Sequence, residues 1–139
     1  MRRRKAKGGS KIEWKNAPDI KKKVLHLIKS LDLFWINASN LHFFRSNYSK
    51  SNAYARIWGF GKIWQMALNQ KPNYIIEVLS EKFDHLSDKE MDRVLLHEIA
   101  HIPKNFSGSL LPHTRRRGKR NFHDRVEELF SMYLKNRKG

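Results

Sequence analysis

Five consecutive residues, His97-Glu98-Ile99-Ala100-His101, have the types and spacing best suited to chemistry, because they form the pattern H-E-x-x-H. On a helix, side chains four positions apart lie on one face, so two imidazoles can bind a single metal ion. Glu98 is rotated by about 100° from His97, close enough to exchange a proton with a metal-bound water without ligating the metal. A metal ion lowers the pKa of such a water and polarises a carbonyl group, while a carboxylate takes and returns the proton. The motif therefore predicts a hydrolytic metal site with one Zn²⁺ per chain.

A catalytic zinc usually has three protein ligands and one open position, so a third ligand is expected outside the motif. The chain has no cysteine, which excludes a thiolate ligand, a cysteine nucleophile and a disulfide framework. Two histidines follow the motif: His113, on a loop that contains glycine and proline, and His123, at the start of the last expected helix. The residues alone leave both open. His26 and His42 are interpreted as packing or surface residues, and His85 receives no role.

The motif lies in a segment with clear helix signals. Ser87 and Glu90 have the spacing of a capping box, in which each side chain accepts a hydrogen bond from the other residue's backbone N–H. Pro103 disfavours helix at the residue before it. The apolar residues between these signals recur at helical spacing, and we expect a helix that ends near residue 102.

The remaining elements follow from hydrophobic periodicity. The pattern predicts helices at 18–32 and 122–135 and strands at 40–47 and 73–79, whereas 54–64 fits either a strand with a glycine bulge or the approach to a short helix. The sequence thus predicts an α+β fold, a short antiparallel sheet packed on the motif helix with an N-terminal and a C-terminal helix. Residues 1–15 are expected to form a flexible basic arm and 16–139 a single domain. We further expect the 73–79 strand to pair with an extended substrate.

The charge of the chain indicates an anionic partner. Its 139 residues carry 29 Lys and Arg against 13 Asp and Glu, a net charge of +16. Basic clusters at 21–23 and 115–120 favour non-specific contact with nucleic acid, although solvated faces explain them equally well. No apolar run reaches the ~20 residues of a membrane span, and no hydrophobic region follows the basic start. We therefore expect a soluble, cytoplasmic protein.

Several stretches resemble the family of putative metallopeptidases of archaea and phages. They are the runs at 95–103, 106–108, 112–113 and 125–130, and upstream those at 55–59, 63–65 and 72–78. This resemblance implies a small zincin-like fold, zinc on His97, His101 and His113, and Glu98 as catalytic acid/base in peptide hydrolysis. The layout is also similar to that of SprT-like proteases, in which the third histidine typically begins a helix, which points to His123.

Two rival functions also fit the sequence. One is a metal-dependent endonuclease of RNA or DNA, which the positive charge suits. The other is a basic nucleic-acid-binding module with a structural metal, which would want four protein ligands, such as His97, His101, His113 and His123. A peptidase implies a protein or peptide substrate instead.

Overall fold

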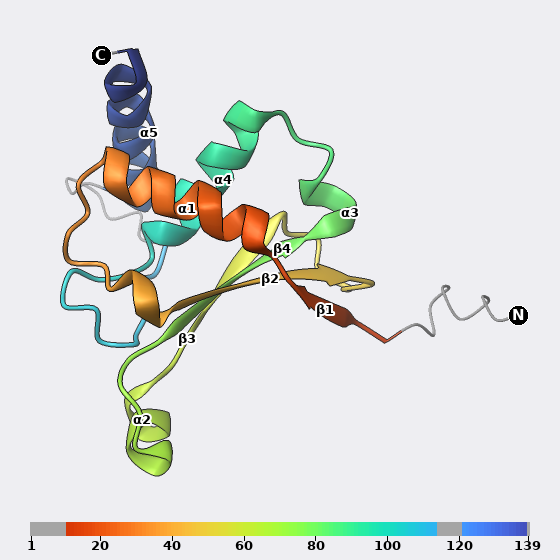
Figure 1. Cartoon of the computed structure of the whole chain (residues 1–139), viewed down its shortest axis with the longest axis vertical. Coiled ribbons are helices and arrows are strands. Elements are labelled where there is room, and N and C mark those ends of the chain that lie inside the picture. The colour runs from red at the N-terminus through yellow and green to blue at the C-terminus, as the bar shows by residue number, and fades with distance from the viewer. Residues whose placement is uncertain (1–10, 114–120, 139) are drawn as a thin grey trace, which may run out of the picture.

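One four-stranded sheet and the helices packed on it make up the fold, in a computed structural model that describes residues 11–113 and 121–138 (Figure 1). In chain order the elements are β1 (Glu13–Asn16), α1 (Pro18–Ser30), the short 3₁₀ helix η2 (Ala38–Asn40), β2 (Leu41–Asn47), β3 (Ala55–Gly59), α2 (Lys62–Leu68), β4 (Tyr74–Leu79), α3 (Ser80–Phe83), α4 (Asp88–Ile99) and α5 (Phe122–Lys138). None of the helices in the described part of the chain has the length and apolarity to cross a membrane.

The sheet is mixed and has the order β1-β2-β4-β3. β2 pairs with β1 in antiparallel and with β4 in parallel orientation, and β3 pairs antiparallel with β4. The apolar strand β4 therefore lies in the centre, where both its edges are hydrogen-bonded and all its side chains except that of Ile75 are buried. β1 and β3 form the two free edges.

The main core lies between one face of the sheet and the helices. Ile76 and Val78 of β4 are fully buried there, and they belong to one cluster with Val24 of α1 and Leu95 of α4. Burying such side chains is the main source of stability in a domain of this size. Packing on both α1 and β4 thus fixes where α4 lies relative to the sheet.

The expected capping box at the start of α4 is confirmed. The hydroxyl of Ser87 accepts a hydrogen bond from the backbone N–H of Glu90 at 3.2 Å, and the Glu90 carboxylate accepts one from the N–H of Ser87 at 3.0 Å. The regular helix ends at Ile99, slightly earlier than expected, and the chain continues in tighter turns in which the N–H of His101 bonds the carbonyl of Glu98 at 3.1 Å. These turns keep His101 close to the helix axis.

The other expected elements also form, but the expectation of an antiparallel sheet is wrong for β2 and β4. The chain runs along the edge as β3, reverses through α2 and returns as β4 into the gap beside β2. This path gives the most apolar strand the central position. It also contradicts the expectation that the 73–79 strand pairs with substrate, because both edges of β4 are already paired.

The expected boundary of the basic arm at residue 15 is also wrong. Residues 13–16 form β1, whose backbone pairs with that of β2 from Glu13↔Asn47 to Asn16↔Phe44. All four side chains are exposed, so no hydrophobic pattern marks this strand in the sequence. Residues 1–10 and the arginine-rich cluster at 115–120 lie outside the described residues, whereas Lys21, Lys22 and Lys23 lie on α1.

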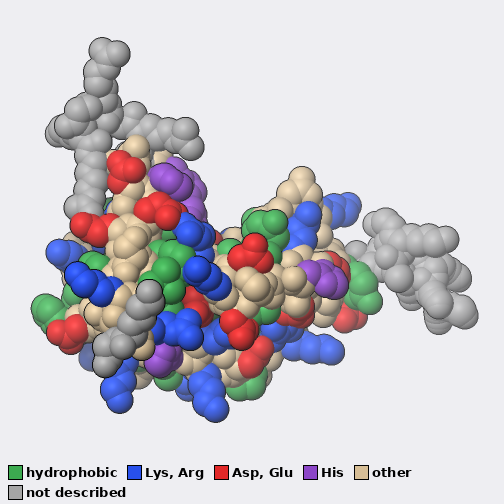
Figure 2. Space-filling model, turned by 90° about the horizontal axis from the view of Figure 1, so that it is seen from above, with side chains coloured by type: hydrophobic (Ala, Val, Ile, Leu, Met, Phe, Trp, Pro, Cys, Tyr) green, Lys and Arg blue, Asp and Glu red, His purple; other side chains and the backbone are tan. Residues whose placement is uncertain are grey.

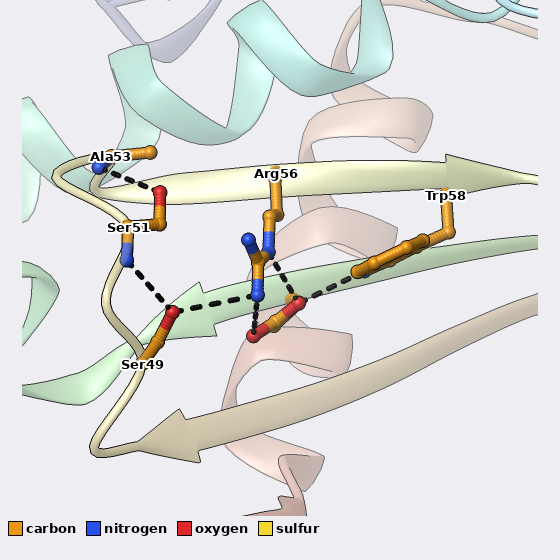
Figure 3. A network of polar contacts seen from close by, with 6 residues as sticks. Ser49, Ser51, Ala53, Arg56 and Trp58 are labelled. Carbon is orange, nitrogen blue, oxygen red and sulfur yellow. Dashed lines mark hydrogen bonds and ion pairs between the residues drawn. The ribbon is translucent and has the colours of Figure 1, made fainter. Parts of the chain in front are cut away.

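The face of the sheet that points away from α1 and α4 holds a buried ion pair. Glu77 of β4 is fully buried, and its carboxylate accepts hydrogen bonds from Arg56 Nε at 2.8 Å and from Trp58 Nε1 at 2.9 Å. Figure 3 shows Arg56 and Trp58 on the same side of β3, with Arg56 also reaching Ser49. Burial alone would raise the pKa of Glu77, but the hydrogen bonds from Arg56 and Trp58 lower it below the ordinary value.

This pair predicts a pH-dependent loss of stability in the Arg56→Met variant. The lowered pKa of Glu77 in the native protein means that its stabilising contribution is present above about pH 4.5 and is lost as the pH falls through the folded-state pKa. Without Arg56, burial raises that pKa and penalises the charged carboxylate at neutral pH. Arg56→Met should therefore lower the free energy of unfolding by about 1–3 kcal/mol at pH 7 and by less at pH 4.

Urea unfolding at both pH values measures this difference. The exposed Lys50→Met serves as the control for the loss of one positive charge. If Arg56→Met lowered the free energy of unfolding equally at pH 4 and pH 7, the assignment of Glu77 as a buried carboxylate would be contradicted.

Candidate metal centre

His97 and His101 project from the end of α4 and the turn that follows it, and their ring centroids are 5.1 Å apart. His97 is half-buried and His101 is buried. The four-residue spacing therefore brings the two imidazoles together, as expected from the motif.

Two hydrogen bonds join His101 to Leu111 and turn the chain back toward the motif. The backbone N–H of Leu111 donates to the carbonyl of His101 at 2.7 Å, and Nδ1 of His101 donates to the carbonyl of Leu111 at 2.5 Å. Because Nδ1 donates its proton, Nε2 is left as the lone-pair nitrogen.

His113 follows two residues after Leu111 and completes a group of three histidines. Its Nε2 lies 3.0 Å from Nε2 of His97, and its ring centroid lies 4.5 Å from that of His101. One ring nitrogen from each of the three residues lies within 4.8 Å of the others. The structure thus brings together the three histidines that the family resemblance implies.

Phe122, the first residue of α5, packs against all three rings. Its ring stacks on that of His101 at 4.2 Å between centroids and meets those of His97 and His113 edge-on at 4.9 and 4.8 Å. Phe122 is buried and restricts the rotation of the imidazoles. Sequence reasoning gave this residue no role at the site, because an aromatic residue at a helix start has no distinguishing spacing.

His123, the other candidate for third ligand, does not belong to this group of described residues. It is exposed on the first turn of α5 and lines a cavity of about 340 Å³ together with His97 and Glu98. The remaining histidines lie elsewhere: His26 packs edge-on against Tyr133, His42 contacts the Asn73 side chain at 2.8 Å, and His85 is exposed in the turn before α4.

Burial sets the electrostatics of the site. Burial, together with the charge of the neighbouring imidazoles, lowers the pKa of His97 to about 4, and burial lowers the pKa of His101. Neutral imidazoles are the form that binds a metal ion. Burial also raises the pKa of Glu98, whose side chain is only 6% exposed, to about 8. A carboxyl group in such surroundings can hold or release a proton near neutral pH.

A set of contacts with the β3–β4 region holds the loop that carries His113. The Gln65 side chain of α2 donates to the carbonyls of Phe60 and Ser107, both at 2.8 Å. The hydroxyl of Tyr74 accepts from the N–H of Gly108 at 2.7 Å and donates to the carbonyl of Ser109 at 2.8 Å. We call these contacts of Gln65 and Tyr74 the loop clamp.

The loop clamp requires glycine at two positions. Gly108 has φ +97°, and a Cβ there would lie 2.2 Å from the carbonyl oxygen of Phe60. A Cβ on Gly59 would lie 2.5 Å from the carbonyl oxygen of Gly108. The backbone of the loop therefore approaches the end of β3 more closely than any side chain permits.

The donor set fits a first-row metal ion with a preference for nitrogen ligands. Two nitrogens bound to a tetrahedral zinc at ~2.0–2.1 Å lie about 3.3 Å apart, close to the separation of the His97 and His113 nitrogens. The hydrogen bond from His101 Nδ1 to a backbone carbonyl is the outer-shell contact that orients a metal-binding imidazole. The three histidines can therefore hold a metal ion without a change of fold.

Comparison with known proteins gives one result. A family model described as "Putative phage metallopeptidase" matches residues 12–133 and thus covers β1 to most of α5, including all three histidines. No curated protein and no solved structure is a significant match to the chain. Because this match spans most of the sequence, the chain belongs to the putative phage metallopeptidase family.

Proposed function

We propose that the protein is a zinc-dependent peptidase, with His97, His101 and His113 as metal ligands and Glu98 as the catalytic acid/base. The observation that carries this proposal is the convergence of three imidazole nitrogens within 4.8 Å beside a buried glutamate on the same helix. Three neutral nitrogen ligands suit zinc and leave a fourth position open, which is the arrangement of catalytic zinc sites.

Each residue has a distinct task in this proposal. A zinc ion in the site supplies a Lewis acid that polarises the scissile carbonyl and lowers the pKa of water. The Glu98 carboxylate accepts a proton from water and returns it to the leaving amine. His101 is held in one tautomer by the Leu111 carbonyl, and Phe122 prevents the rings from turning away.

The cavity beside Glu98 is where the substrate is proposed to bind. Its lining joins the motif face of α4 to Ala53, Tyr54 and Ala55 at the start of β3. β3 is a free edge of the sheet, so its backbone can pair with an extended peptide in the way that was expected of the 73–79 strand.

The two rival functions have less support from the geometry. A structural site would want a fourth ligand, and His123 is not grouped with the other three histidines. An endonuclease would need cationic groups that bind a phosphodiester at the site, whereas Arg93 in the lining of the adjoining cavity is already ion-paired with Glu127. This cavity therefore offers little charge to hold a phosphate group, and a peptide is the better fit.

Glu98→Gln separates catalysis from metal binding. The amide cannot accept a proton, so cleavage of a labelled unfolded protein such as casein should fall by about 10²- to 10⁴-fold. Zinc content and the circular dichroism spectrum should stay as in the wild type, and Glu13→Gln, an exposed change on β1, should retain full activity. Undiminished cleavage by Glu98→Gln would remove Glu98 from the mechanism.

Replacement of each candidate third ligand tests the ligand set. His113→Ala should lose tightly bound zinc and remain folded, while His123→Ala should keep one zinc per chain, because only His113 brings a nitrogen to the other two. Metal analysis of the purified variants, together with circular dichroism, measures both properties. Loss of zinc and of fold in both variants would instead support a structural four-histidine site.

The loop clamp predicts an effect on metal affinity from a residue that touches no ligand. Gln65→Ala should weaken zinc binding by about 10-fold, because it frees Ser107 and with it the loop that carries His113. Competition with a chromophoric chelator gives the affinity. Gln70→Ala, an exposed change just after α2, is the matched control, and equal affinities for the two variants would contradict the clamp.

A further inference from the structure

The sheet has a second face, opposite to the one that packs on α1 and α4. Side chains alternate between the two faces along each strand. The pairings Trp14↔Ser46, Phe44↔Glu77 and Trp58↔Ile75 therefore place Trp14, Phe44, Trp58 and Ile75 on one face, across four strands. We call this the open face.

Aromatic side chains dominate the open face and stay accessible. Trp14, Phe44, Trp58 and Phe60, joined by Trp64 of α2, line a cavity of about 540 Å³. Trp14 is 54%, Trp58 48% and Trp64 59% exposed, although burying such rings is strongly favourable. A cluster of large exposed rings of this kind marks a binding surface.

The carboxylate of Glu77 on the open face already has hydrogen-bond donors and a positively charged partner. Glu77 is the charged residue in the lining, and it is paired with Arg56 and bonded to the indole N–H of Trp58. This contact holds the Trp58 ring in place, and the Arg56 guanidinium lies 5.2 Å from the centre of that ring (Figure 3). The cavity thus offers several aromatic faces, of which that of Trp58 is held in place, and no free carboxylate.

The elements around the cavity carry positive charge. Lys11 is exposed just before β1, and Lys62 and Lys71 are exposed at the two ends of the α2 segment. The whole chain has a net charge of +16, although Asp and Glu side chains are interspersed with Lys and Arg on the face drawn in Figure 2. Such a charge opposes pairing with a second copy and attracts an anionic ligand.

We propose that the open face binds single-stranded DNA, with bases stacked on the rings of Trp14, Trp58 and Trp64 and phosphates near the surrounding lysines. Bases of a single strand expose their π-faces, and stacking on aromatic side chains combined with cationic contacts is how proteins hold them. The lining has no hydroxyl or amide side chain to bond a ribose 2′-hydroxyl, so DNA fits the cavity better than RNA. The lining of this cavity contains none of the proposed metal ligands and not the proposed catalytic residue.

Binding of oligo-dT of about 12 nucleotides to the full chain tests the proposal. We expect Trp14→Ala and Trp64→Ala each to raise the Kd by about 5- to 150-fold, as measured by anisotropy of the labelled oligonucleotide. Trp14→Phe keeps an aromatic face and should restore most of the affinity. Phe34→Ala removes an aromatic side chain that is 85% exposed outside the cavity and should bind like the wild type. Circular dichroism checks that each variant is folded.

The same variants distinguish other ligands of the open face. Equal Kd values for Trp14→Ala, Trp64→Ala and Phe34→Ala would overturn the proposal, because the lysines and arginines alone would then account for DNA binding. The proposal would also be overturned if Trp14→Ala lost affinity for vesicles of anionic phospholipid, for poly-glutamate or for oligo-U but not for oligo-dT. Quenching of tryptophan fluorescence by oligo-dT, reduced in Trp14→Ala and Trp64→Ala, would support direct stacking.

Discussion

The candidate metal centre depends on the pair of hydrogen bonds between His101 and Leu111. One of them gives His101 a single tautomer and the other fixes the backbone two residues before His113. A histidine on a loop binds a metal ion tightly only if the loop is already ordered before the metal binds, because ordering it costs conformational entropy. The hydrogen bonds of the loop clamp, from Gln65 and Tyr74, contribute to this order.

Burial of α4 explains the protonation states at the site. The helix packs its apolar face between α1 and the sheet, so Glu98 and the two motif histidines face a largely desolvated space. Desolvation raises the pKa of the carboxyl group and lowers those of the imidazoles, which gives neutral ligands beside a carboxyl group that can exchange a proton. The fold therefore provides the electrostatics of the site as well as its geometry.

The sequence predicts the motif helix well because its signals are local: a capping box, an apolar period and a proline. His113 could be reached from the family resemblance, whereas spacing alone left His123 as an equal candidate. Phe122, the loop clamp and the open face could not be predicted, because each depends on contacts between segments far apart in the chain, such as Gln65 with Ser107. β1 was missed since its four exposed side chains have no alternating pattern.

The central claim is that three histidines hold one zinc ion and leave a fourth position open. X-ray absorption at the zinc edge of the loaded wild-type protein tests it most directly. The account predicts one zinc per chain with three imidazole nitrogens at ~2.0–2.1 Å and one oxygen. A fourth imidazole around the zinc, or no stable zinc binding at all, would contradict it.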